Sequence, residues 1–389
     1  MQLTARQVLQ QFAHVLQQDL FPLLQAANGA LSADLELLAS VVCLAPLGRL
    51  LSTRRATGRP AKDRAAVATA FMAKAILNLP TTRDLISRLR VDDALRRICG
   101  WSSASALPHE SKFSRAFAEF AQTQLPQQLH EAVIAATQQQ RLIGHIARDS
   151  TAIHVRERYP ETTRQKNKAA RKWNPKQRNG SFARAKAAER GTRIQRQRHQ
   201  QLDRMLSDLP RQCDMGAKTN SQGCEQYWRG YKLHLDVADG QVPVSAVLTS
   251  ASVHDSQVAI PLMTMTSKRV VHLYELMDSA YDADEIHAHS RELNHVPIIA
   301  PHPRRGTKKP SQLPKVFPVR LAPQLTWAEQ DRYKERTMSE RVNARLKDEF
   351  GASQIRVRGA AKVMAHLMFG VLALTVDQWL RLRVPVNKP

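Results

Sequence analysis

Two aspartates follow apolar stretches, at positions where a carboxylate could do chemistry. Asp149 comes after HIAR and before ST, and Asp278 comes after LYELM and before SAYD. An ionised carboxylate on a buried strand is costly unless it is paired or binds a cation. Two Mg²⁺ ions about 4 Å apart, held by roughly three carboxylates, can activate water and stabilise the leaving oxygen of a phosphodiester. A single aspartate at a strand end is also a common turn former or cap, so both interpretations stay open.

A third acid lies in the segment from Tyr333 to Phe350, YKERTMSERVNARLKDEF. The segment has no Gly or Pro, and it is predicted to be one helix. At about 100° per residue, an arc of roughly 60° holds a polar stripe. The stripe contains Tyr333, Arg336, Glu340 and Lys347, with Asn343 just beside it. The opposite side is apolar and contains Met338, Val342 and Leu346. One face is therefore expected to pack on the core and the other to present the stripe.

Each member of this stripe has a chemical use. Glu340 could complete a three-carboxylate metal site with the two aspartates. The other acids of the segment lie off the stripe. Arg336 and Lys347 could clamp a phosphate on either side of it. Tyr333 could donate a hydrogen bond to a phosphate or stack on a base. The alternative is a solvated stripe held together by ion pairs within the helix.

The overall charge favours a polyanionic partner. The chain has 58 Lys and Arg against 34 Asp and Glu, a net charge of +24, which points first to nucleic acid and second to an acidic membrane surface. No signal peptide is visible. The longest apolar run, Val363 to Val376, includes His366 and is too short for a confident membrane span, so we expect a buried helix and no membrane partner. The four Cys show no zinc spacing, which fits a reducing compartment, the bacterial cytoplasm or nucleoid.

At 389 residues the chain is long enough for two domains, and its periodicity changes near residue 140. Residues 1–140 are rich in Leu, Ala and Gln at helical spacing. Thr81 or Thr82 is expected to cap the helix that begins at RDLISRLR, and Ser111 the helix KFSRAFAEFA. A bundle of short helices follows from this pattern. Both a helix-turn-helix that binds DNA and a plain helical scaffold fit it.

Residues 141–389 read as a mixed sheet flanked by helices. The expected strands are 145–155, a hairpin of 228–240 with 242–252, 270–281 and 296–301. Asp255 and Asp282 are expected to be N-caps of the helices that follow them. The HAH of His287 to His289 is an unfavourable metal site, because residues i and i+2 of a helix do not share a face.

A basic insertion separates the first of these strands from the hairpin. Residues 156–211 contain 17 Lys or Arg and 5 Asp or Glu, a net charge of +12, which is half of the excess of the whole chain. The segment NPKQRNGS predicts a turn, and residues 183–209 a helical stretch. A solvated charged helix and an arm that follows the DNA backbone are both open. We favour the arm, because like charges at this density repel unless phosphates neutralise them.

The ordered set of motifs resembles the DDE transposases of bacterial insertion sequences. The spacing of Tyr333, Arg336, Glu340 and Lys347 matches the YREK signature of that family letter for letter. The DST at Asp149 and the DSAYD at Asp278 look like its first and second acidic motifs. Similarity extends over most of the chain and includes GYKLHLDV, TSASVHDSQ, IRVRGAAKVMAHLMFGVLAL, GRPAKDRAAVATAFMAKAIL and LPHESKFSRAF.

The resemblance implies a fold and a division of roles. It implies an RNase H-like α/β fold in residues 141–389, preceded by an all-helical DNA-binding domain in residues 1–140. The acids Asp149, Asp278 and Glu340 would hold two Mg²⁺ ions, with Mn²⁺ as a substitute, and would be the catalytic residues. Tyr333, Arg336 and Lys347 would contact phosphates at the ends of the transposable element.

By the same resemblance, the protein would cut double-stranded DNA at the element ends and join the 3′-OH ends to target DNA. A homodimer would hold the two ends together. Two other functions remain open: a catalytically silent repressor derived from a transposase, and a metal-dependent nuclease without strand transfer. Only 61 residues separate Asp278 from Glu340, so the large β-rich insertion of some relatives does not fit, and a hairpin intermediate in cutting the second strand is left open.

Overall fold

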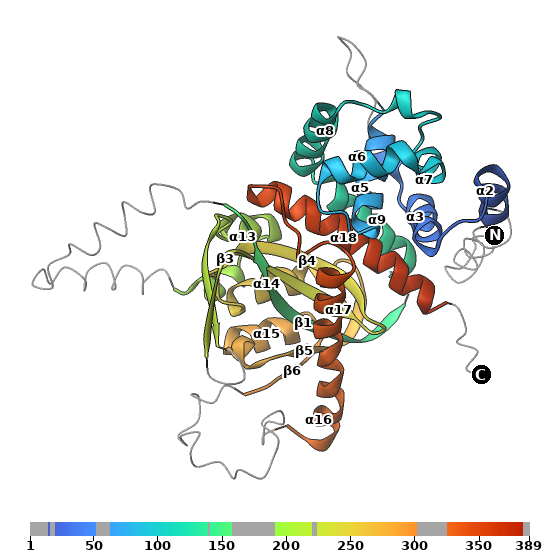
Figure 1. Ribbon diagram of the computed structural model, residues 1–389. Helices are drawn as coiled ribbons and strands as arrows, with labels where there is room; N and C mark the ends of the chain where they lie inside the picture. The colour runs from blue at the N-terminus through green and yellow to red at the C-terminus, as the bar shows by residue number, and fades with distance from the viewer. Residues whose placement is uncertain are drawn as a thin grey trace, which may run out of the picture.

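The computed structural model describes residues 20–51, 63–138, 141–157, 191–219, 224–301 and 325–383, together with Val15. Its N-terminal part is helical throughout the described residues, and its C-terminal part is a mixed sheet with helices on both faces (Figure 1). The N-terminal helices are α2 (Phe21–Asn28), α3 (Ala33–Leu44), α4 (Leu47–Leu50), α5 (Arg64–Ile76), α6 (Thr82–Val91), α7 (Asp93–Ile98), η2 (Ala104–Ala106), α8 (Glu110–Gln122) and α9 (Leu125–Gln138). The all-helical expectation is confirmed for this region.

The helix starts in this region follow capping chemistry. Thr81 is the N-cap of α6, and it forms a capping box with Asp84, as the sequence predicted. The prediction that Ser111 caps the next long helix is wrong. His109 is the N-cap of α8, because its ring nitrogen accepts the Ser111 N–H at 3.2 Å and thereby satisfies an amide of the first turn. Ser111 lies inside that turn.

The sheet has the strand order of an RNase H-like fold. Its strands are β1 (Leu142–His154), β2 (Asp214–Thr219), β3 (Glu225–Ala238), β4 (Val242–Ser250), β5 (Val271–Met277) and β6 (Val296–Ile299). Strand β3 pairs antiparallel with β1, β2 and β4, and β1, β5 and β6 run parallel to one another. The predicted hairpin is therefore β3 with β4, and the mixed α/β, RNase H-like class is confirmed.

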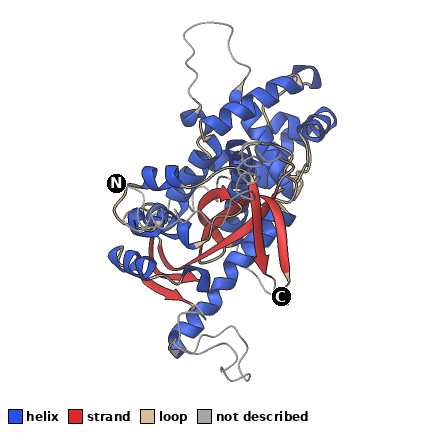
Figure 2. Cartoon of the chain, turned by 90° about the vertical axis from the view of Figure 1, so that its left-hand side faces the viewer, coloured by secondary structure: helices blue, strands red, loops and turns tan. Residues whose placement is uncertain are grey.

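The side chains of β3 alternate between the two faces of the sheet. Leu233, Leu235 and Val237 belong to the main hydrophobic cluster, and His234 and Asp236 point to the other face. On the main-cluster face lie α17 (Thr337–Asp348) and α18 (Ala360–Arg381), and on the other face lie α14 (Ser256–Ser267) and α15 (Asp284–Glu292). Figure 2 shows helices on either side of the strands.

Helix α18 joins the two parts of the molecule. It contacts α3, α5, α8 and α9 of the N-terminal part as well as β4 and α17. It is the one helix, among the described residues, that is long and apolar enough to cross a membrane, but 67% of the relevant window is buried inside the protein. The apolar run from Val363 to Val376 is thus a core helix, as expected, and one hydrophobic cluster spans both parts of the chain.

Two expectations about the sheet region need correction. Asp282 is not the N-cap of α15: Ala283 holds that position, and Asp282 ends the short 3₁₀ helix η3 (Ser279–Tyr281) and lies 3.2 Å from His287. Asp255 does stand at the N-cap of α14, but its carboxylate makes no cap hydrogen bond. It pairs instead with Lys232 at 2.9 Å, because a nearly buried carboxylate gains more from a cation than from an amide.

Part of the basic insertion packs on the sheet region. Residues 158–190 lie outside the described residues, and so does much of the predicted arm. The expected helix to residue 209 is broken into α12 (Arg193–Gln197) and α13 (Leu202–Asp208), which contact α14. Basic side chains there pair within the protein, as Arg193 does with Asp208 at 3.0 Å. The chain bends because both short helices follow the surface of α14.

Candidate active site

Strands β1 and β5 bring Asp149 and Asp278 together. Their parallel register pairs Ala147 with Leu276, and continuing it by two residues sets Asp149 beside Asp278. Asp149 lies opposite Leu235 of β3, so its side chain points to the face covered by α17. The carboxylate of Asp278 accepts the Ala280 N–H at 2.9 Å, which fixes one of its oxygens as a cap of η3 and leaves the other available.

The two aspartates are electrostatically coupled. Burial raises the pKa of Asp149 to about 6, and the charge of Asp278 acts in the same direction. Burial also raises the pKa of Asp278, and the nearby charge of Asp255 adds to that effect. Arg336 and Lys218 oppose the rise at both aspartates. Two carboxylates therefore lie close together where they are largely shielded from solvent, and a bound cation would stabilise their ionised forms.

Helix α17 supplies a contact that the sequence did not single out. The side-chain amide of Asn343 donates to Asp149 Oδ2 at 3.1 Å, and Asn343 is only 7% exposed. Its carbonyl oxygen, Oδ1, is buried and has no hydrogen-bond partner among the described residues. Asn343 lay just beside the polar stripe on the helical wheel, next to the buried face, and that boundary position was the available signal.

The segment that carries the stripe is not one helix, contrary to expectation. Tyr333 ends α16 (Trp327–Tyr333), a 3₁₀ turn η5 (Lys334–Arg336) follows, and α17 begins at Thr337. A 3₁₀ turn advances about 120° per residue instead of about 100°, so the angular positions before Thr337 are shifted relative to the ideal wheel. The expected apolar face is confirmed, since its three residues Met338, Val342 and Leu346 are at most 2% exposed.

Arg336 connects Glu340 to the aspartates. Its guanidinium lies 2.6 Å from Glu340 Oε1, and its charge partly opposes the rise in the pKa of both Asp149 and Asp278 that burial causes. The Tyr333 ring centroid lies 5.8 Å from the same guanidinium. The side chain of Glu340 is 54% exposed. The alternative of an ion pair within the helix is therefore observed between Arg336 and Glu340, and the charge of Arg336 also acts on the two aspartates.

Lys347 of α17 also lies within electrostatic reach of Asp149. It is half-buried, and burial lowers its pKa, as does the charge of Lys218 on β2, whereas Asp149 acts in the opposite direction. Lys218 was not among the residues that the sequence singled out. A basic strand residue carries no signal of its own, and only the pairing of β2 with β3 brings it here.

The donor set of this site fits a hard divalent cation. Carboxylate and amide oxygens are the ligands that Mg²⁺ and Mn²⁺ take in proteins. Asp149 and Asp278 offer carboxylate oxygens, and the buried Asn343 Oδ1 still needs a partner. Within the described residues, Asp149, Asp278 and Glu340 do not all approach within 4.8 Å of one another, and Glu340 is held by Arg336.

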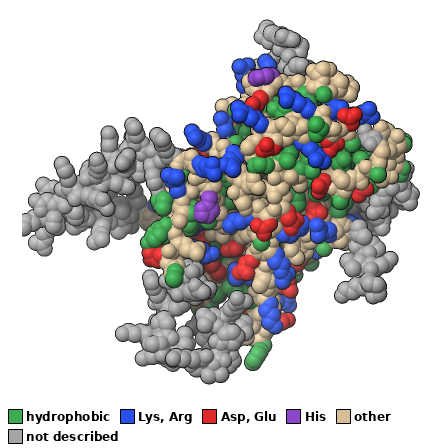
Figure 3. Space-filling model, in the orientation of Figure 1, with side chains coloured by type: hydrophobic (Ala, Val, Ile, Leu, Met, Phe, Trp, Pro, Cys, Tyr) green, Lys and Arg blue, Asp and Glu red, His purple; other side chains and the backbone are tan. Residues whose placement is uncertain are grey.

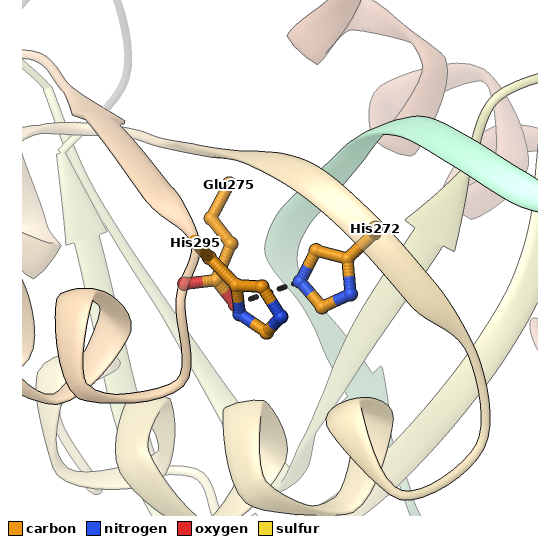
Figure 4. A group of neighbouring side chains, drawn as sticks. All are labelled: His272, Glu275 and His295. Atoms are coloured by element: carbon orange, nitrogen blue, oxygen red, sulfur yellow. Dashed lines mark hydrogen bonds and ion pairs between the residues drawn. The ribbon is translucent and has the colours of Figure 1, made fainter.

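A different group of side chains does meet that distance, and Figure 4 shows it: His272, Glu275 and His295. It is unfavourable for a metal ion. The guanidinium of Arg148 lies 3.4 Å from the same Glu275 oxygen that faces both imidazoles, and the centroids of the two rings lie 3.6 Å apart with their planes tilted by 32°. A divalent cation at Glu275 would have to compete with the charge of this guanidinium, which already pairs with the carboxylate. We interpret the group as part of a buried ion-pair network.

Two matches to known protein families cover much of the chain. Residues 191–376 match the family model described as Transposase DDE domain, and residues 24–119 match the one described as Transposase domain (DUF772). The first match contains Asp278 and Glu340 and begins after Asp149. No curated protein matches the chain.

Proposed function

Because the chain belongs to the DDE transposases of insertion sequences, we propose that it binds the ends of its own element, cuts them and joins them to target DNA. The observation that carries this proposal is the meeting of three elements. Asp149 on β1 and Asp278 after β5 lie side by side, and α17 places Asn343 on Asp149 and Glu340 on the arginine that faces both aspartates.

In this proposal Asp149, Asp278 and Glu340 hold two Mg²⁺ ions, or Mn²⁺ in their place. When bound, these ions would lower the pKa of a coordinated water and neutralise charge on the scissile phosphate. The protein's own contribution is orientation. Asn343 fixes Asp149 Oδ2, and the Ala280 amide fixes one oxygen of Asp278. Glu340 would join the two aspartates as a metal ligand once its ion pair with Arg336 opens.

The basic residues around the site fit phosphate contacts. Arg336 and Lys347 are partly buried beside the aspartates, and Tyr333 lies against Arg336. A guanidinium released from Glu340 is free to bind a phosphate oxygen on the DNA end. Tyr333 then supplies a hydroxyl donor or a ring face within the same reach. Lys218 of β2 would add a further phosphate contact.

We further propose that the protein acts as a homodimer on DNA and works in the bacterial cytoplasm, on the nucleoid. Two element ends must be cut and joined in one event, which a dimer achieves with one active site per end. The net charge of +24 supports binding to the DNA backbone.

The test uses a labelled DNA that carries both ends of the element in which the gene lies, with a supercoiled plasmid as target. With Mg²⁺ or Mn²⁺, we expect nicks at the ends, followed by covalent joining of the 3′ ends to the plasmid. Nicks without joining in either metal would support a simple nuclease instead. Specific binding without any nick would support a silent repressor.

A further inference from the structure

A cavity of about 570 Å³ lies between the N-terminal helices and the segment that leads into α18. It is formed by α5, the start of α6, α8 and residues 356–362, well separated in sequence from the two aspartates. Its polar lining is mostly basic and includes Lys74, Arg83, Arg356, Arg358 and Lys362. None of these residues takes part in the candidate active site.

The innermost of these cations is Lys74 of α5. It is only 7% exposed, and no carboxylate pairs with it among the described residues. Burial lowers the pKa of Lys74 to about 8, and the charge of Asp84 only partly offsets this. A buried ammonium without an anionic partner is unfavourable, and it is stabilised when an anion enters the cavity that it lines.

The other cations point to the same kind of ligand. Arg83 already pairs with Glu110 at 3.0 Å, whereas Arg356, Arg358 and Lys362 are exposed and have no ion-pair partner within the described chain. Five cationic side chains thus line the cavity together with one carboxylate, Glu110. The charge of Asp84 also reaches Lys74, but Asp84 is engaged in the capping box of α6. The first turn of α6 also lines the cavity, and a helix N-terminus favours an anion.

Figure 3 shows Lys and Arg side chains gathered where Figure 1 places the N-terminal end of α18. Helix α17, which carries Glu340, lies on the same face of the molecule. The basic residues that follow α17 and line the cavity begin at Arg356, eight residues after Asp348, the last residue of α17. We expect a duplex that lies along this face to reach both α17 and the cavity.

We propose that this cavity is a phosphate-binding site, with Lys74 at its base, that takes a backbone phosphate of DNA when DNA lies on the face shown in Figure 3. The phosphate chemistry follows from the cavity itself. That the phosphate comes from DNA rests on the proposed function.

The experiment uses the full chain without divalent metal, so that it does not depend on cleavage. Lys74→Met keeps the volume of the side chain and removes its charge. Lys112→Met makes the same change of charge at an exposed position of α8 that does not line the cavity. Sulfate, which stays doubly charged at neutral pH, serves as the probe for the cavity, and a labelled duplex serves as the probe for DNA.

We expect sulfate to raise the melting temperature of the wild type and of Lys112→Met clearly more than that of Lys74→Met. Duplex affinity at low salt should fall about tenfold to a hundredfold in Lys74→Met, the effect of one charged hydrogen bond, and the slope of log affinity against log salt should decrease by about one. The double variant Arg356→Gln, Arg358→Gln changes only exposed residues and should show the same losses even if Lys74→Met folds poorly.

The first two of the following results would each overturn part of this inference, and the third separates it from the proposed function. An equal rise in melting temperature on adding sulfate in Lys74→Met, the double variant and Lys112→Met would reject the proposal that the cavity binds an anion. A lost sulfate response with unchanged duplex affinity would assign the cavity to free phosphate and reject DNA as the source. Normal cleavage by Lys74→Met would leave the proposed function intact, so the two proposals fail independently.

Discussion

The side-chain amide of Asn343 on α17 donates a 3.1 Å hydrogen bond to Asp149 on β1, and this bond joins the helix of Glu340 to the strand of the first aspartate. The two residues are 194 positions apart in the sequence. Asp149 is partly buried beside Asp278, so the orientation of its oxygens decides what it can bind.

Asn343→Ala is expected to slow cleavage roughly fivefold to a hundredfold, because loss of a hydrogen bond to a buried carboxylate costs about 1 to 3 kcal/mol. DNA affinity should stay within twofold. Cleavage rates at saturating DNA and binding without metal measure the two effects separately. Ser353→Ala, which removes a hydrogen bond at the other end of α17, should leave both unchanged. An equal loss in both variants would reduce the role of Asn343 to helix stability.

Arg336 pairs with Glu340 at 2.6 Å, and its charge also acts on both aspartates, so it is expected to compete with a bound cation. Arg336→Gln should therefore tighten Mn²⁺ binding to the DNA-free protein by roughly twofold to fivefold, since it removes a competing charge. Binding to element ends should weaken, because a phosphate contact is lost. Titration calorimetry with Mn²⁺ and a duplex binding assay give the two readouts. Weaker Mn²⁺ binding in this variant would show that Arg336 does not compete with the metal.

The buried ion pairs of Arg148 with Asp236 and Glu275 are expected to contribute to the free energy of unfolding. Arg148 is 1% exposed, lies 2.7 Å from Asp236 and 3.4 Å from Glu275, and is the cation these two buried acids share. Arg148→Met leaves both carboxylates without it and should lower the free energy of unfolding by roughly 3 to 5 kcal/mol. Urea unfolding measures this. Arg381→Met, which removes an exposed arginine that pairs with Asp377, should cost less than about 1 kcal/mol. Similar costs would contradict a buried ionic network.

The cavity of Lys74 should respond to pH. Burial lowers the pKa of Lys74 to about 8, and sulfate binding should weaken as the pH rises from 7 to 9, because the ammonium loses its proton. The other groups facing it are Asp84, Glu110, Arg83, Arg356, Arg358, Lys362 and His366. Burial lowers the pKa of His366 to about 4, so His366 is neutral across this range.

The same shift has a consequence for folding. The pKa of Lys74 is lower in the folded protein than its ordinary value of 10.5, so the unfolded chain binds more protons between about pH 8 and 10.5. The free energy of unfolding of the anion-free wild type should rise in that window relative to Lys74→Met. Parallel stability curves for the two proteins, together with a flat sulfate response, would contradict a buried, titrating Lys74.

Alternation and turn signals were enough to predict β1, which carries Asp149, and β5, which ends just before Asp278; the strand expected over 270–281 was too long, because residues 279–281 form η3. The hairpin of β3 with β4 and the apolar face of α17 followed from local patterns of period 2 and 3.6. These patterns are local and repeat over many residues, so they survive changes at single positions.

The relationships within the site depended on tertiary structure. The 3₁₀ turn at Lys334–Arg336 broke a segment in which no Gly or Pro marked a break. Asn343, Lys218 and the pair of Lys232 with Asp255 reached the aspartates only through packing of α17, β2 and α14 on the sheet. Single residues of this kind carry no periodic signal, and their partners lie far away in the sequence.

The most direct test of the account compares cleavage of labelled element ends by Asp149→Asn, Asp278→Asn, Glu340→Gln and the control Glu335→Gln, an exposed acid on the 3₁₀ turn beside Arg336. We expect each of the first three variants to bind DNA but to cut it at least about a hundredfold more slowly than the wild type. Each variant loses a proposed metal ligand, which contributes several kcal/mol to stabilising the transition state. Glu335→Gln should cut at the wild-type rate. Wild-type cleavage by any one of the first three variants would contradict the assignment of these acids to a single metal-dependent site.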